Sequence, residues 1–159
     1  MRDAFAKIPT PALFIGLAGL IPFVVGAAGA WLAEPAAAAL ALNAMLGYGA
    51  VILSFLGGVH WGRALAPDLA MRPNWMQLIW SVTPALIGWG AMFTGQIYSV
   101  LIVYLIAFTL AFIVDAKAVR GGLFPAWYGT LRKILTTGVI LSLAAALYAV
   151  FDASRFAGG

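Results

Sequence analysis

The sequence contains no cysteine and only one histidine in its 159 residues. Without cysteine, the chain alone supplies no disulfide, thiolate metal site, cysteine nucleophile or iron–sulfur ligand. A single histidine also excludes any metal or haem site that requires several histidines from this chain. We therefore expect no metal site, no catalytic residue set and no cofactor, while a bound lipid is compatible with the composition.

Charged residues are also scarce, and apolar residues are correspondingly abundant. Asp, Glu, Lys and Arg make up 9% of the chain and apolar residues 64%, whereas soluble domains have about 25% charged and about 45–50% apolar residues. A bilayer core of about 30 Å needs roughly 20 apolar residues in a helix. Five stretches without Asp, Glu, Lys or Arg approach or exceed that length: residues 12–31, 37–61, 75–93, 98–114 and 134–151.

Backbone groups in lipid must form their hydrogen bonds internally, so these stretches are expected to be helices. The sequence therefore predicts an all-α integral membrane bundle of five transmembrane helices, forming a single domain over residues 1–159. The first span also has features of a cleaved signal peptide, because basic residues precede it and small residues end it. We favour retention, since signal h-regions are usually about 7–15 residues long and this run is longer.

The distribution of Lys and Arg predicts the orientation. With the N-terminus on one side, eight basic residues lie on that side and only Arg155 lies on the other. Basic residues in short loops favour the cytoplasmic face. We predict a multi-pass protein of a bacterial inner membrane, with the N-terminus inside and the C-terminus outside. The eight residues are Arg2, Lys7, Arg63, Arg72, Lys117, Arg120, Arg132 and Lys133.

A stripe of small and polar residues follows one side of the second predicted helix. Asn43, Gly47, Ser54, Gly58 and Trp61 fall within a narrow sector at 100° per residue. Small residues allow close helix approach in lipid, and Asn and Ser form interhelical hydrogen bonds. We interpret the stripe as a packing face inside the bundle, with a ligand groove as the alternative.

Polar side chains also gather at the predicted cytoplasmic border. His60, Arg63, Asp115, Tyr128 and Arg132 each lie near a helix end on that side. Their polar groups need partners away from hydrocarbon. We predict that they form one linked cluster, in which Asp115 pairs with Arg63 or Arg132; separate solvation around the rim is the alternative.

The role of His60 stays open between three possibilities. It is a hydrogen-bonded interfacial residue, a proton-relay or quinone-contact residue, or a contact to a partner protein. The surplus of basic residues at this border favours anionic membrane lipids as partners. Nothing in the sequence predicts a nucleic-acid partner.

Three stretches together resemble a known family. They are GYGAVILSFLGGVHWG at 47–62, WSVTPALIGW at 80–89 and PAWYGTLRKILT at 125–136. The chain resembles the family of small five-helix bacterial inner-membrane proteins called domain of unknown function 3429, to which a mitochondrial membrane protein is similar. The resemblance implies a retained first helix and no established activity. The motif positions are Ser54, Gly57, Gly58, His60, Trp61, Trp127, Tyr128, Leu131 and Arg132.

Two functions from different classes remain. The first hypothesis is a non-enzymatic accessory or assembly subunit of a larger energy-transducing membrane complex. The alternative is a small transporter or channel for a small solute or proton, suggested by the stripe, by His60, and by Pro22 and Pro84, which interrupt two spans. An enzyme is the weakest hypothesis, because no nucleotide, zinc-protease or serine-hydrolase motif is present.

Overall fold

The computed structural model describes residues 8–66 and 75–157, with side chains described up to residue 152. Every regular element in these ranges is helical, and five helical segments are long and apolar enough to cross a membrane. These segments are Thr10–Leu32, Pro35–Ala64, Trp75–Thr94, Ile97–Arg120 and Ala126–Asp152. The predicted all-α bundle of five spans is confirmed.

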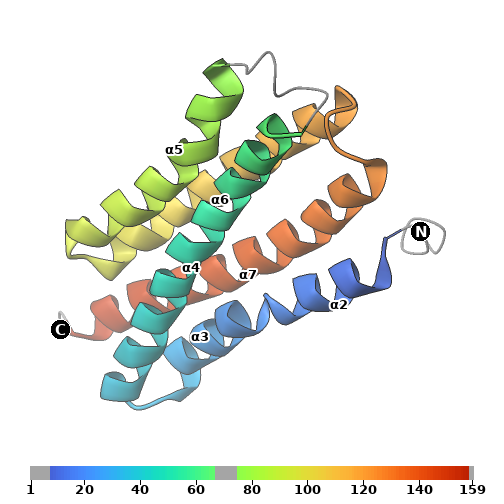
Figure 1. Cartoon of the computed structure of the whole chain (residues 1–159). Coiled ribbons are helices and arrows are strands. Elements are labelled where there is room, and N and C mark those ends of the chain that lie inside the picture. The colour runs from blue at the N-terminus through green and yellow to red at the C-terminus, as the bar shows by residue number, and fades with distance from the viewer. Residues whose placement is uncertain (1–7, 67–74, 158–159) are drawn as a thin grey trace.

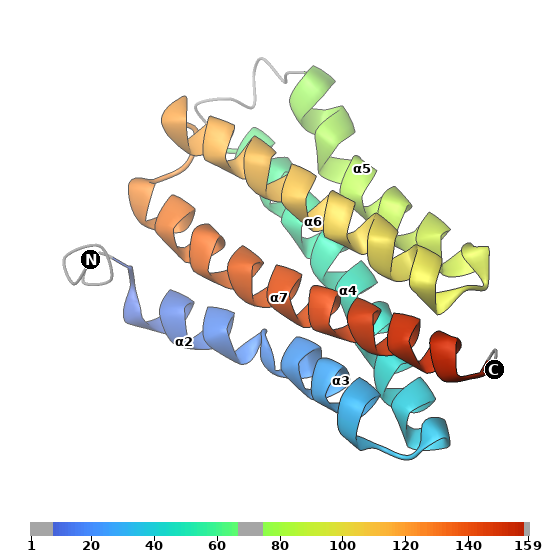
Figure 2. The same ribbon diagram turned by 180° about the vertical axis from the view of Figure 1, so that it is seen from behind.

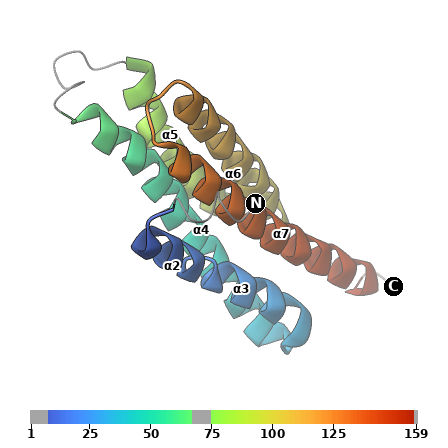
Figure 3. The same cartoon turned by 90° about the vertical axis from the view of Figure 1, so that its right-hand side faces the viewer.

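The elements lie in three groups across the bundle. The first span consists of α2 (Thr10–Ala18) and α3 (Ile21–Leu32), which lie on one side. On the opposite side lie α5 (Trp75–Ala91), followed by the short 3₁₀ turn η1 (Met92–Thr94), and α6 (Ile97–Arg120). Between the two groups lie α4 (Pro35–Ala64) and α7 (Ala126–Ala157), as Figures 1, 2 and 3 show from three directions.

We call one end of the bundle the polar end. There α4 and α6 finish and α2, α5 and α7 begin, along the top and the right-hand side of Figure 1. The turn that joins α6 to α7 lies at this end and requires Gly122, whose φ of +76° favours glycine. Two backbone hydrogen bonds hold the turn: the N–H of Gly122 donates to Val119 and that of Leu123 donates to Ala118.

The two prolines behave differently. The first span is interrupted at Gly19 and Leu20, and α3 begins just before Pro22, where a missing N–H costs no helical hydrogen bond. By contrast, α5 runs through Pro84. There the Thr83 hydroxyl donates to the carbonyl of Ile79 at 2.8 Å.

Tyr104 lies at the centre of the bundle and joins three helices. Its side chain is fully buried on α6, and its hydroxyl donates to the carbonyl of Gly88 on α5 at 3.2 Å. Its ring lies against Gly49 of α4, where an added Cβ would be only 2.7 Å from the ring. Phe23 of α3 and Phe108 of α6 pack edge to face beside it, with ring centroids 5.7 Å apart. This interior fixes α4 and α5 against α6, which carries Asp115 at the polar end.

The last two spans are longer than the sequence predicted. We expected the fourth span to end at residue 114 and the fifth to begin at 134, because charged residues follow and precede those positions. Instead α6 continues through Asp115 to Arg120, and α7 already begins at Ala126. Asp115 and Arg132 form an ion pair in the interior of the bundle. Because each charge has a buried partner, α6 and α7 can include these residues.

The interpretation of the α4 stripe as an internal packing face is wrong. Asn43, Ser54, Gly58 and Trp61 are exposed, Gly47 is partly exposed, and a Cβ added at Gly47 or Gly58 would meet no atom within 4 Å. The opposite side of α4 is buried instead, through large side chains together with Gly49, Gly57 and His60. In lipid, both faces of a helix are apolar, so residue size alone did not distinguish the interior from the outside.

Candidate functional site: a buried polar cluster at one end of the bundle

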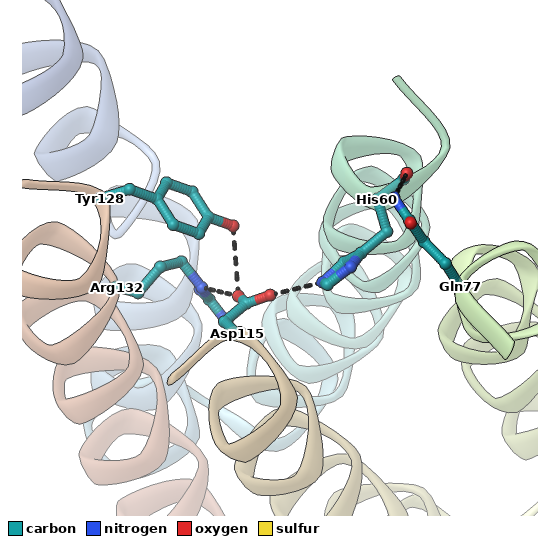
Figure 4. Close-up of polar contacts among 5 residues, drawn as sticks. All are labelled: His60, Gln77, Asp115, Tyr128 and Arg132. Atoms are coloured by element: carbon teal, nitrogen blue, oxygen red, sulfur yellow. Dashed lines mark hydrogen bonds and ion pairs between the residues drawn. The ribbon is translucent and has the colours of Figure 1, made fainter. Parts of the chain in front are cut away.

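Asp115 is the centre of the polar end. It lies on α6 about one turn before the helix ends, and its side chain is only 2% exposed. One side faces His60 of α4, and the other faces Tyr128 and Arg132 of α7 (Figure 4). We call these four residues the polar cluster; it connects three of the five spans.

Both carboxylate oxygens of Asp115 accept hydrogen bonds. His60 Nε2 donates to Oδ1 at 2.8 Å. Arg132 Nε donates to Oδ2 at 2.5 Å, and the Tyr128 hydroxyl donates to the same oxygen at 3.2 Å. Because a carboxylate accepts only, Nε2 of His60 carries a proton in this contact.

Three of the four cluster residues are almost fully buried, and Tyr128 is partly buried. His60 is 3% exposed and Arg132 is 5% exposed. Breaking a buried ion pair by removing one partner costs about 3–5 kcal/mol, because the remaining charge loses its compensation. The cluster therefore holds α4, α6 and α7 in one arrangement.

The loop between α6 and α7 covers the cluster. Phe124 is buried, and its ring meets the His60 imidazole edge to face with centroids 5.1 Å apart. It also packs against the ring of Tyr128 at 5.0 Å. Arg63, on the last turn of α4, donates from Nε to the carbonyl of Leu123 at 3.0 Å and so fixes the loop over His60.

The structure thus brings four of the five predicted border residues together and gives Arg63 a different partner. Arg132, rather than Arg63, supplies the guanidinium that the structure places on Asp115. The side chains of Arg2, Lys7 and Arg72, which contributed to the orientation argument, lie outside the described residues, as does that of Arg155.

Sequence reasoning missed two contributors. Gln77, near the start of α5, donates from Nε2 to the backbone carbonyl of His60 at 3.0 Å (Figure 4). The signal in the sequence that points to Gln77 is its polar amide in the first turn of an otherwise apolar helix. Phe124 gave no comparable signal, because its contact with His60 depends on the path of the loop.

Two buried side-chain atoms at this end have no hydrogen-bond partner within the described residues: Arg132 Nη2 and Thr136 Oγ1. Both side chains belong to α7 and lie one turn apart. Buried polar groups are nearly always hydrogen-bonded. The guanidinium is the more significant of the two, because it is charged and because only its Nε bonds to the described chain.

Comparison with known proteins agrees with the architecture. Residues 8–148 match the family described as Protein of unknown function (DUF3429). The chain belongs to this family. Transmembrane protein 69 of Xenopus tropicalis is 38% identical over 150 residues, covering 91% of this chain and 56% of that protein. Transmembrane protein 69 of Mus musculus is 31% identical over 140 residues, covering 87% of this chain and 56% of that protein.

The chain therefore spans little more than half the length of these two relatives. Their name describes a membrane protein, in agreement with the five apolar helices of this DUF3429 member. No solved structure matches the chain. Membership in the family thus supports a multi-pass membrane protein.

Proposed function

We propose that the protein is a non-enzymatic accessory or assembly subunit of a larger complex in an energy-transducing membrane, and that it contacts its partner through the exposed stripe of α4. The stripe consists of Asn43, Gly47, Ser54, Gly58 and Trp61. Close approach of helices in lipid depends on small residues and interhelical hydrogen bonds. On this chain the glycines face outward, where they admit a helix of another protein.

Asn43 is the observation that favours a protein partner over lipid alone. It is exposed and lies about 12 Å along α4 from Pro35, at 1.5 Å per residue. Within the described residues its amide makes no hydrogen bond. Ser54 satisfies its own hydroxyl by donating to the carbonyl of Ala50 at 3.0 Å, so Asn43 is the group that needs an external partner.

The polar cluster supports a structural role for the bundle. Its three donors converge on one carboxylate, and the loop covers them. This arrangement keeps α4 fixed relative to α6 and α7, so the stripe is presented on a rigid helix. In this proposal the polar end faces the cytoplasm of a bacterium, where the basic residues also contact anionic lipids.

A small transporter or channel remains the alternative function. In that function His60 would lie at the inner mouth of the pathway. In the structure His60 Nε2 is bonded to Asp115, and both side chains are nearly fully buried. Flux measurements in proteoliposomes distinguish the two functions: solute or proton flux that disappears in His60→Asn supports transport and contradicts the accessory role.

Native purification in a mild detergent tests the proposal. We expect the wild-type chain to co-purify with identifiable subunits of a respiratory or photosynthetic complex, and Gly58→Leu to lose them, because the larger side chain keeps the partner helix away. Ala144→Leu is the matched control, since Ala144 is an exposed small residue on α7, away from the stripe. Equal recovery of the partner with Gly58→Leu and wild type contradicts the proposed surface.

A further inference from the structure

A groove extends through one half of the bundle beside the polar cluster. Its volume is about 420 Å³, within the range of about 300–1,000 Å³ that is usual for ligand sites. Its walls come from the first span, α4 and α7, with Phe108 from α6. The groove is a feature of the tertiary structure and is separate from the α4 stripe.

The groove follows the helices from the polar end to the middle of the bundle. On α7 the lining residues run from Trp127 to Val139, and on α4 they run from Val59 to Tyr48. Twelve residues of helix at 1.5 Å each correspond to about 18 Å, and one leaflet contributes about half of the 30 Å core. The groove therefore has the length of a lipid chain in a single leaflet.

The two ends of the groove differ in chemistry. Trp127, Tyr128 and Arg132 line it near the polar end. Apart from Tyr48, every other lining side chain is Ala, Val, Ile, Leu or Phe, or the position is glycine. Such a change from polar to apolar along one groove fits an amphiphile, with its head beside Arg132 and its chain toward Phe23.

Arg132 indicates the charge of the headgroup that the groove would accept. It is 5% exposed, and only its Nε bonds to the described chain, while Nη2 is buried without a hydrogen-bond partner. Among the described charged residues of the polar end, Asp115 is acidic and five are basic, so positive charge is in excess. The basic residues are Arg63, Lys117, Arg120, Arg132 and Lys133. Both facts favour an anionic head with acceptor oxygens over a neutral one.

We propose that the groove binds one anionic phospholipid of the surrounding membrane. One acyl chain lies between α2, α4 and α7, and the phosphate accepts hydrogen bonds from the terminal nitrogens of Arg132. Gly16 and Gly19 of the first span line the groove without side chains.

Native mass spectrometry of the full chain in detergent tests this site. The chain is titrated separately with phosphatidylglycerol, with phosphatidylcholine of the same acyl chains, and with a long-chain quinone. We expect one high-affinity phosphatidylglycerol, bound about tenfold more tightly than phosphatidylcholine. Both lipids present a phosphate to Arg132, but the choline cation of phosphatidylcholine is repelled by the surplus of basic residues at the polar end. Equal affinity for the two phospholipids, or tighter binding of the quinone, overturns the proposal.

Substitutions at two valines of α4 test whether the lipid binds in the groove. Val59 lines the groove, whereas Val51 is exposed and does not line it. Val59→Trp fills the groove, and we expect it to weaken the first phosphatidylglycerol at least about tenfold, while Val51→Trp leaves that affinity unchanged. Retention of the first lipid by Val59→Trp, or equal losses in both variants, overturns the proposal. Because neither valine belongs to the polar cluster, the comparison does not depend on a variant that disrupts the ion pair.

Discussion

Replacing Asp115 with Asn tests the structural importance of the polar cluster. The substitution keeps the shape of the side chain and removes its charge. Arg132 then stays buried beside a neutral amide, and one of the donors from His60, Tyr128 or Arg132 faces the amide NH₂ group instead of an oxygen. The buried guanidinium loses its charged partner.

The expected loss follows from the burial of both partners. Removing one member of a buried ion pair costs about 3–5 kcal/mol, which is a large part of the total stability of about 5–15 kcal/mol that proteins have. For a chain of this size, about 2–4 °C is lost per kcal/mol, so we expect the apparent melting temperature in detergent to fall by about 6–20 °C.

A double variant separates the loss of the pair from the loss of packing. Asp115→Asn together with Arg132→Met removes both charges, while the amide oxygen can still accept a hydrogen bond from His60. Removing both members of a buried ion pair avoids the uncompensated charge that makes removal of one member costly, so we expect the double variant to be more stable than Asp115→Asn. A melting temperature of Asp115→Asn within 2 °C of wild type, an interval equal to about 1 kcal/mol or less, would contradict the expected contribution of the buried ion pair. A double variant that is less stable than Asp115→Asn would do the same.

Three further predictions concern packing, the tyrosine hydroxyl and orientation. Gly57→Ala places a Cβ onto the backbone carbonyl of Ser81, which no rotamer change relieves, so we expect a loss of about 1–3 kcal/mol in thermal unfolding. Gly58→Ala is its control, since a Cβ there meets nothing within 4 Å, and a similar loss in both variants contradicts the packing of α4 on α5. Tyr128→Phe removes the 3.2 Å hydrogen bond to Asp115 but keeps the ring, so a loss of about 1 kcal/mol is expected; an unchanged melting temperature means that the bond contributes nothing. Reporter fusions at both ends should place the N-terminus in the cytoplasm and the C-terminus outside, and two fusions on one side exclude the predicted orientation.

Hydropathy was sufficient to predict the five spans, because each helix must be apolar along a length set by the bilayer. It was less successful at the ends of α6 and α7. There the rule that charges end a span failed, since Asp115 and Arg132 neutralise each other within the bundle. Pairing of charges between distant segments depends on tertiary structure, which span prediction does not include.

The depth of the border residues was predictable from topology, but the partners were not. Arg63 and Arg132 were equivalent candidates for Asp115 in sequence. The structure directs Arg63 to the loop carbonyl of Leu123 and Arg132 to the carboxylate. The direction of the α4 stripe was not predictable either, because lipid and protein interior are both apolar. The groove is formed by residues of four spans that are distant in sequence, so it depends on tertiary structure.

Site-specific photocrosslinking in native membranes shows whether the α4 stripe contacts a protein partner. A photoreactive amino acid is placed at Asn43, on the stripe, and in a second variant at Ala144 on the exposed side of α7. The accessory-subunit proposal predicts that Asn43 crosslinks to one membrane subunit of an energy-transducing complex, identified by mass spectrometry, and that Ala144 does not. Crosslinks from Asn43 to lipid alone, or the same proteins from both positions, would contradict it.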